Sequence, residues 1–181
     1  MRVRSLLAIT LAVVLSVSWL SIILYPSVQD FMGTNPFWNG VRDFDRRFDA
    51  EMLTSLDQLT PEPEGNVLVV IPSLPYQDEE LQQLVKFVSG GGTLLVMDDY
   101  GYGNQVLVAL GLEMEFVGAT LLDPYLNYRN QAFPLIVDLA PELKDAGIKE
   151  LVLNHATALN TGSRYETLAR SSDISFIDSN G

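Results

Sequence analysis

The first hydrophobic pattern along the chain is a run without charged residues from Ser5 to Tyr25, directly after Arg2 and Arg4. Its 21 residues, at about 1.5 Å per helical residue, match a hydrocarbon core about 30 Å thick. The two preceding arginines place the N-terminus in the cytoplasm by the positive-inside rule. We therefore predict a single-pass transmembrane anchor at residues 1–25, cell-membrane localisation and an extracytoplasmic remainder.

Two other interpretations of this run remain open. A cleaved signal peptide has a shorter apolar stretch followed by small residues, whereas Leu24, Tyr25 and Pro26 follow here. A buried core helix is the second alternative, although the run is hydrophobic on every face.

After the apolar run, turn-forming residues mark residues 26–40 as a stalk, with Asn35-Pro36 and Asn39-Gly40 as its turn signals. A short helix is predicted at Val41–Phe48, where apolar side chains recur at helical spacing between charged ones. We assign residues 41–181 to one soluble domain and expect that domain to be incomplete at its C-terminus.

The middle of the chain alternates between strand and helix patterns. Continuous apolar runs at Val67–Ile71 and Thr93–Met97 are typical of strands buried on both faces of a parallel sheet. The segments Asp78–Ser89 and Gln105–Leu110 have the apolar spacing of helices. This order predicts an α/β fold with a mostly parallel sheet and flanking helices.

The remainder of the chain contains only short extended segments. These are residues 113–117, 119–122, 135–139, 150–153, 167–170 and 174–177. Between them, residues 124–134 form an aromatic loop with Tyr125, Tyr128, Arg129 and Phe133. This loop is predicted either to contact a partner or to pack onto further strands.

Composition then removes several classes of function. The net charge is −12, and without Arg2 and Arg4 it is about −14, so the chain would repel a nucleic acid. No cysteine is present, which excludes thiol catalysis, disulfides and cysteine-ligated metals. His155 is the single histidine, and we interpret it as structural or exposed. No cofactor is predicted.

The candidate site is the segment that follows the second predicted strand. It contains Asp98, Asp99, Tyr100, Gly101, Gly103 and Asn104. Open α/β sheets bind ligands beyond the carboxyl ends of their strands, and the two carboxylates could hold Ca²⁺ or Mg²⁺. The alternative is that Asp99 or Asn104 caps the next helix and that the glycines shape the turn.

Residues 71–112 carry a family resemblance through three features: the strand ending at Pro72, the helix ending at Gly91-Gly92, and the Asp98–Asn104 turn. Together with the stalk segment Thr34–Gly40, they resemble a domain-of-unknown-function family with a class I glutamine amidotransferase-like fold. That family is similar to extracytoplasmic domains of gliding-motility-type ABC transporter accessory proteins. The resemblance covers about residues 35–181. It implies a flavodoxin-like fold, one or more membrane helices and no established activity.

These observations predict a non-catalytic extracytoplasmic binding or scaffold domain with membrane-protein partners, as an accessory part of a transporter or envelope complex. An amidotransferase requires a cysteine, and a serine hydrolase of the nucleophile-elbow type requires Gly-x-Ser-x-Gly, which the sequence lacks. The alternatives are a divergent metal-dependent hydrolase and a small-molecule or sugar sensor, both using the Asp98–Asn104 loop.

Overall fold

The computed structural model describes residues 3–24, 28–37 and 39–178. Two compact units make up the chain, residues 1–54 and residues 55–181. Trp38 of the predicted stalk, Tyr25 at the end of the predicted anchor and the last three residues lie outside the described part.

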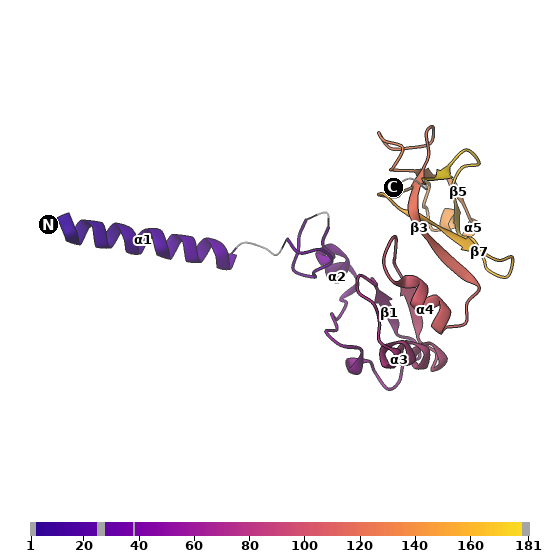
Figure 1. Cartoon of the computed structure of the whole chain (residues 1–181), viewed down its shortest axis with the longest axis horizontal. Coiled ribbons are helices and arrows are strands. Elements are labelled where there is room, and N and C mark those ends of the chain that lie inside the picture. The colour runs from indigo at the N-terminus through magenta and orange to yellow at the C-terminus, as the bar shows by residue number, and fades with distance from the viewer. Residues whose placement is uncertain (1–2, 25–27, 38, 179–181) are drawn as a thin grey trace. The chain divides into compact units, whose positions relative to one another are not determined.

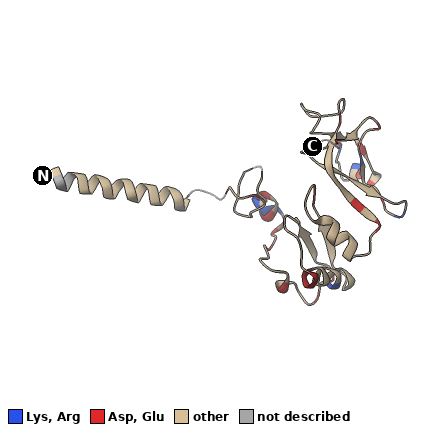
Figure 2. Cartoon of the chain, viewed as in Figure 1, with Lys and Arg blue, Asp and Glu red and all other residues tan. Residues whose placement is uncertain are grey.

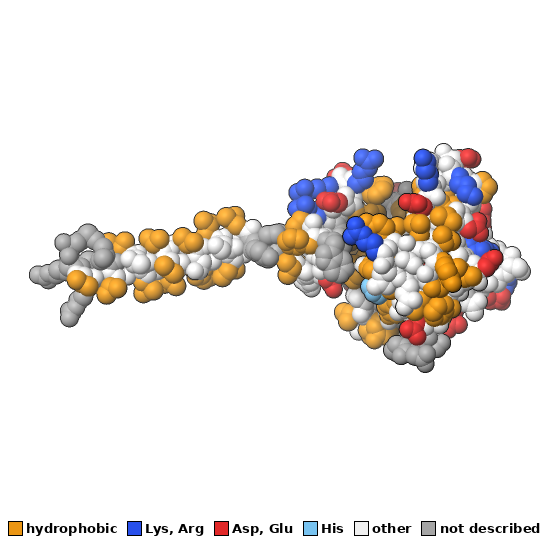
Figure 3. Space-filling model, turned by 90° about the horizontal axis from the view of Figure 1, so that it is seen from above, with side chains coloured by type: hydrophobic (Ala, Val, Ile, Leu, Met, Phe, Trp, Pro, Cys, Tyr) orange, Lys and Arg blue, Asp and Glu red, His pale blue; other side chains and the backbone are white. Residues whose placement is uncertain are grey.

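The first unit contains helix α1 (Val3–Leu24) and helix α2 (Arg42–Phe48). Hydrophobic side chains are exposed along α1 (Figure 3). Over the described residues, no helix combines the length and the apolar character that a membrane crossing requires. The predictions of a transmembrane anchor at residues 1–25 and of cell-membrane localisation are therefore wrong.

Between α1 and α2, the chain is organised by Asn35, which is fully buried. Its amide nitrogen donates to the carbonyl of Gln29 (2.8 Å) and to Oδ1 of Asn39 (3.0 Å). Its Oδ1 accepts a hydrogen bond from the backbone of Phe37 (2.9 Å). The predicted turn residues Asn35 and Asn39 thus close the loop through their side chains.

The second unit begins with the predicted strand–helix–strand–helix order (Figure 1). The elements are the 3-10 helix η1 (Leu56–Gln58), β1 (Val67–Val70), α3 (Asp78–Ser89), β2 (Thr93–Val96) and α4 (Gly103–Ala109). Strands β1 and β2 are parallel, with Val67 opposite Thr93 and Val70 opposite Val96. The prediction of these elements and of their parallel pairing is confirmed.

One hydrophobic cluster holds this part together. Val70, Leu84 and Val106 are its buried centre, one residue each from β1, α3 and α4. Leu94 and Val96 of β2 pack against it. Full burial of one such side chain contributes about 1.5–3 kcal/mol, so this cluster fixes both helices on one face of the strand pair.

The remaining elements are short strands and one short helix. They are β3 (Met114–Leu122), β4 (Leu135–Ile136), β5 (Asp138–Leu139), α5 (Pro141–Asp145), β6 (Leu151–Val152), β7 (Thr157–Thr161), β8 (Ala169–Arg170) and β9 (Phe176–Ile177). Strand β3 pairs with β7 and β9, β4 with β6, and β5 with β8. All four pairings are antiparallel.

The predicted flavodoxin-like, mostly parallel sheet is therefore wrong. Within the described residues, β1 and β2 form the single parallel pair, and the other sheets are small and antiparallel. A further parallel strand needs a crossover connection of a dozen or more residues, usually through a helix. After Gly111, α5 is the one helix of the described chain, and it has five residues.

Candidate functional site

The Asp98–Asn104 loop connects β2 to α4, and its first carboxylate binds the backbone of the loop itself. Oδ1 of Asp98 accepts a hydrogen bond from Gly101 N (2.8 Å), and Oδ2 accepts one from Gly103 N (2.6 Å). Gly103 is the first residue of α4, so Asp98 supplies the acceptor that the start of this helix needs. The sequence predicted a capping role for Asp99 or Asn104, whereas Asp98 performs it.

Asn104 joins α4 to the next strand. Its Nδ2 donates to the carbonyl of Phe116 (3.0 Å), and its Oδ1 accepts from the Phe116 N–H (2.8 Å). The side chain therefore satisfies both backbone groups of one β3 residue. Neither polar atom of Asn104 points to an open ligand position, so its role is to hold α4 against β3.

Tyr100 ties the loop to the antiparallel pair of strands β3 and β7. Its hydroxyl lies 3.0 Å from Oγ1 of Thr120 and donates a hydrogen bond to the backbone carbonyl of His155. The ring of His155 packs edge-on against Phe133, with ring centroids 5.0 Å apart. The imidazole thus has a structural contact, and the backbone of His155 is the part that meets the loop.

The two glycines of the loop are required because a side chain at either position would clash with its neighbours. A Cβ atom on Gly103 would lie 2.6 Å from Oδ2 of Asp98 and 2.8 Å from the ring of Phe116. On Gly101, a Cβ atom would lie 2.7 Å from Oδ1 of Asp98. Both glycines therefore allow the backbone to approach the Asp98 carboxylate.

Asp99 is the exposed carboxylate of the loop. Partial burial raises its pKa, and the neighbouring charge of Asp98 raises it further, while a hydrogen bond from the backbone of Thr157 lowers it. The same two effects act on Tyr76, whose pKa is raised by burial and by Glu80 and Asp98. Added negative charge is therefore unfavourable in this region.

The hypothesis of a cation at Asp98 and Asp99 stays a prediction. Among the residues that the structure describes, no group of three or more His, Asp or Glu side chains is arranged to hold a metal ion. Both oxygens of Asp98 already accept backbone hydrogen bonds. A cation bound there would have to compete with the helix cap.

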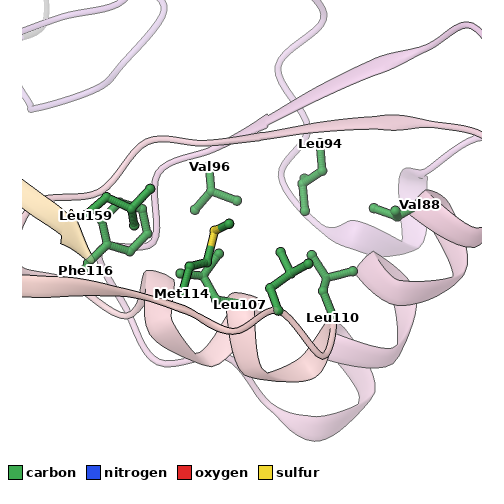
Figure 4. A pocket seen from close by; sticks show the side chains of 9 residues that line it. Val88, Leu94, Val96, Leu107, Leu110, Met114, Phe116 and Leu159 are labelled. Atoms are coloured by element: carbon green, nitrogen blue, oxygen red, sulfur yellow. The ribbon is translucent and has the colours of Figure 1, made fainter. Parts of the chain in front are cut away.

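An apolar groove of about 360 Å³ lies beside this loop, and the sequence did not reveal it. Figure 4 shows Leu94 and Val96 of β2 facing Leu107 of α4, Met114 and Phe116 of β3 and Leu159 of β7 across this space. The groove is hydrophobic on all sides. The sequence predicted Leu94 and Val96 as part of a buried strand, but the chain does not fill the space beside them.

Two further polar features were missed by the sequence analysis. Asp123 is buried, and its carboxylate accepts hydrogen bonds from Tyr125 N, Leu126 N and the Ser172 hydroxyl (2.9, 2.7 and 2.6 Å). The Asp123-Pro124 pair is a turn signal that could have indicated this role. Gln105 is the second, because its Oε1 accepts from Tyr76 N (2.9 Å).

The predicted aromatic loop remains exposed at Tyr125 and Tyr128. The guanidinium of Arg129 lies 4.9 Å from the centre of the Tyr128 ring, a cation–π arrangement. Whether this loop contacts a partner stays a prediction.

Comparison with known proteins gives one match. A family model described as a domain of unknown function, DUF4350, matches residues 34–181. No curated protein matches the chain, and no solved structure does.

Proposed function

The chain belongs to the DUF4350 family, a domain of unknown function, and we propose that it is a non-catalytic module that binds another protein. The observation that carries this proposal is the open apolar groove between β2, α4, β3 and β7. Hydrophobic surface left open in a folded unit is typical of sites that another molecule covers.

The chemistry of the Asp98–Asn104 loop supports a binding role over a catalytic one. The polar side-chain atoms of Asp98 and Asn104 form hydrogen bonds with backbone groups of the chain, and the Tyr100 hydroxyl donates to the backbone carbonyl of His155. A general base or a nucleophile needs access to a substrate. The loop therefore holds α4 against β3, and both elements line the groove.

The net charge of residues 55–181 restricts the kind of partner that this unit can bind. Residues 55–181 contain 6 Lys and Arg and 18 Asp and Glu, a formal charge of −12. Acidic residues are distributed over the elements of this unit (Figure 2). A polyanion would be repelled, and a basic or neutral protein would be attracted. Residues 71–112 resemble a family that is in turn similar to ABC transporter accessory proteins, so a protein of a transporter complex is the first candidate partner.

Cross-linking and affinity capture of the tagged full chain from its own cells test this proposal. We expect a defined partner protein to be captured in stoichiometric amount. Recovery of the chain alone would contradict the proposal. So would hydrolysis of an ester or phosphoester panel that Asp99→Asn abolishes, because this would identify an enzyme.

A further inference from the structure

Strand β2 has one edge paired and one edge open. The N–H groups of Thr93 and Met97 bond to Asn66 and Val70, on the β1 side (both 2.9 Å). In a parallel ladder, alternate residues bond to the same neighbour, so Leu94 and Val96 direct their backbone groups to the opposite edge. No strand among the described residues pairs with β2 at that edge.

The apolar groove lies along this open edge. Leu94 and Val96 line it with their side chains, and Met114, Phe116 and Leu159 line it from the paired strands β3 and β7 (Figure 4). The unpaired backbone groups of β2 and a hydrophobic groove for side chains therefore lie next to each other. An added strand would use both, because its backbone pairs with the edge while alternate side chains enter the groove.

The shape of this site favours an extended occupant. Strand β2 has four residues, which span about 13 Å at roughly 3.3 Å per residue. A helix satisfies its own backbone groups and would leave those of Leu94 and Val96 unpaired. Edge strands that avoid partners carry lysine, proline or a bulge, whereas β2 reads Thr-Leu-Leu-Val and has none of these.

The negative charge of Asp99, near the C-terminal end of β2, indicates the charge of the residue that a bound segment places there. Asp99 is exposed and lies three residues beyond Val96, the last paired residue of β2. It accepts a hydrogen bond from the backbone of Thr157, which is two residues from the groove residue Leu159. Burial and the charge of Asp98 raise the pKa of this carboxyl, and a cation placed beside it would favour its ionised form. A second copy of the chain would bring another strongly acidic unit, so like charges disfavour self-pairing.

We propose that the open edge of β2 binds an extended segment of another protein, with alternating apolar side chains in the groove and a Lys or Arg beside Asp99. This inference rests on the proposed protein-binding function and specifies its partner. The segment would complete the unit by adding a third strand to the β1–β2 pair.

A labelled peptide tests the proposal directly. The probe is a short peptide in which Val and Thr alternate between terminal Lys residues, and its binding to the full chain is followed by fluorescence anisotropy. We expect saturable binding that weakens roughly tenfold, about 1.4 kcal/mol, in Leu159→Asn. Val117→Asn is the matched control, because Val117 of β3 is 41% exposed and Leu159 of the paired strand β7 is 45% exposed, but Val117 does not line the groove.

Two modified peptides test the mode of binding. Replacement of the terminal Lys residues by Glu is expected to weaken binding by roughly tenfold or more. Methylation of alternate backbone amides is expected to abolish binding for one parity and to leave it unchanged for the other, because only alternate amides of a strand face its neighbour. Equal tolerance of both methylated peptides would overturn strand addition. Thermal melting confirms that both protein variants fold.

The remaining outcomes separate this inference from the proposed function. Absence of saturable peptide binding, or equal weakening in Leu159→Asn and Val117→Asn, overturns the inference. Sedimentation that shows a dimer lost in Leu159→Asn overturns it as well, since the occupant is then a second copy. If Leu159→Asn still captures the partner from cells, the proposed function stands without the β2 site. If the wild-type chain captures none, the proposed function itself fails.

Discussion

At the scale of single residues, Asp98 and Asp99 are chemically identical neighbours with different roles. Asp98 accepts two hydrogen bonds at the start of α4, whereas Asp99 lies beside Thr157 with its ionised form disfavoured. We expect Asp98→Ala to lower the free energy of unfolding by about 1–2 kcal/mol through loss of the cap. Urea denaturation at neutral pH measures this.

Asp99→Asn is the matched control for that experiment. A carboxyl whose pKa is raised by folding costs stability above its folded pKa, and this cost is absent below its ordinary value of 3.8. The substitution is therefore expected to increase stability slightly at neutral pH. Equal destabilisation by Asp98→Ala and Asp99→Asn would show that the loop is not organised around Asp98.

Asp123 has the opposite dependence on pH. Burial raises its pKa, but the hydrogen bonds from Ser172, Tyr125 and Leu126 outweigh burial and leave the pKa below 3.8. Its stabilisation is fully present above 3.8 and is lost as the pH falls through the folded pKa. We expect Asp123→Asn to be less stable than wild type at neutral pH by about 1–3 kcal/mol. This difference should begin to narrow below pH 3.8 and should close once the pH is below the folded pKa, as a series of denaturation experiments at decreasing pH would show.

At the scale of elements, the apolar periodicity of the sequence predicted those helices and strands that local interactions determine. The strand–helix–strand–helix order is confirmed, because each of these segments has a clear apolar pattern and β2 follows glycines that end α3. The strands β4, β5, β6, β8 and β9 have two residues each. Tertiary contacts decide such short pairings, so their antiparallel partners could not be read from the sequence.

The candidate site divides in the same way. The position of the Asp98–Asn104 loop at the end of a strand follows from the pattern, but the identity of its partners does not. Asn104 bonds to Phe116, and Tyr100 bonds to His155, which is 55 residues away along the chain. The groove could not be predicted for a related reason, because its lining residues come from β2, α4, β3 and β7, which meet only through tertiary contacts.

Gly103 tests the packing between α4 and β3. Gly103→Ala places a methyl group 2.6 Å from the Asp98 carboxylate and 2.8 Å from the Phe116 ring. We expect a loss of about 1–3 kcal/mol in the free energy of unfolding, measured by thermal or urea denaturation. Gly162→Ala is the control, because its nearest neighbour is 3.9 Å away. A neutral Gly103→Ala would mean that α4 and β3 are not held at this point.

At the scale of the whole molecule, the apolar run that suggested a membrane anchor and the acidic charge lead to different conclusions. No helix of the described chain meets the requirements of a membrane crossing, which removes the predicted anchor. The charge of −12 on residues 55–181 remains, and it acts over roughly a Debye length, about 10 Å at 0.1 M salt. Partner selection by charge is therefore a property of this unit.

If charge selects the partner, peptide binding should depend on the salt concentration. Binding of the Lys-flanked peptide is expected to weaken severalfold between about 0.1 M and about 1 M salt, because the screening length falls to about 3 Å. The same peptide with uncharged ends should change little. Fluorescence anisotropy at increasing salt measures both, and equal salt dependence would remove the role of charge.

Hydrogen exchange at β2, followed by NMR, tests the central claim that this edge receives a strand. The amide of Leu95 lies on the side paired with β1, whereas those of Leu94 and Val96 face the open edge. On addition of the peptide, we predict slower exchange at Leu94 and Val96 and little change at Leu95. Unchanged exchange at Leu94 and Val96 under saturating peptide would contradict the account.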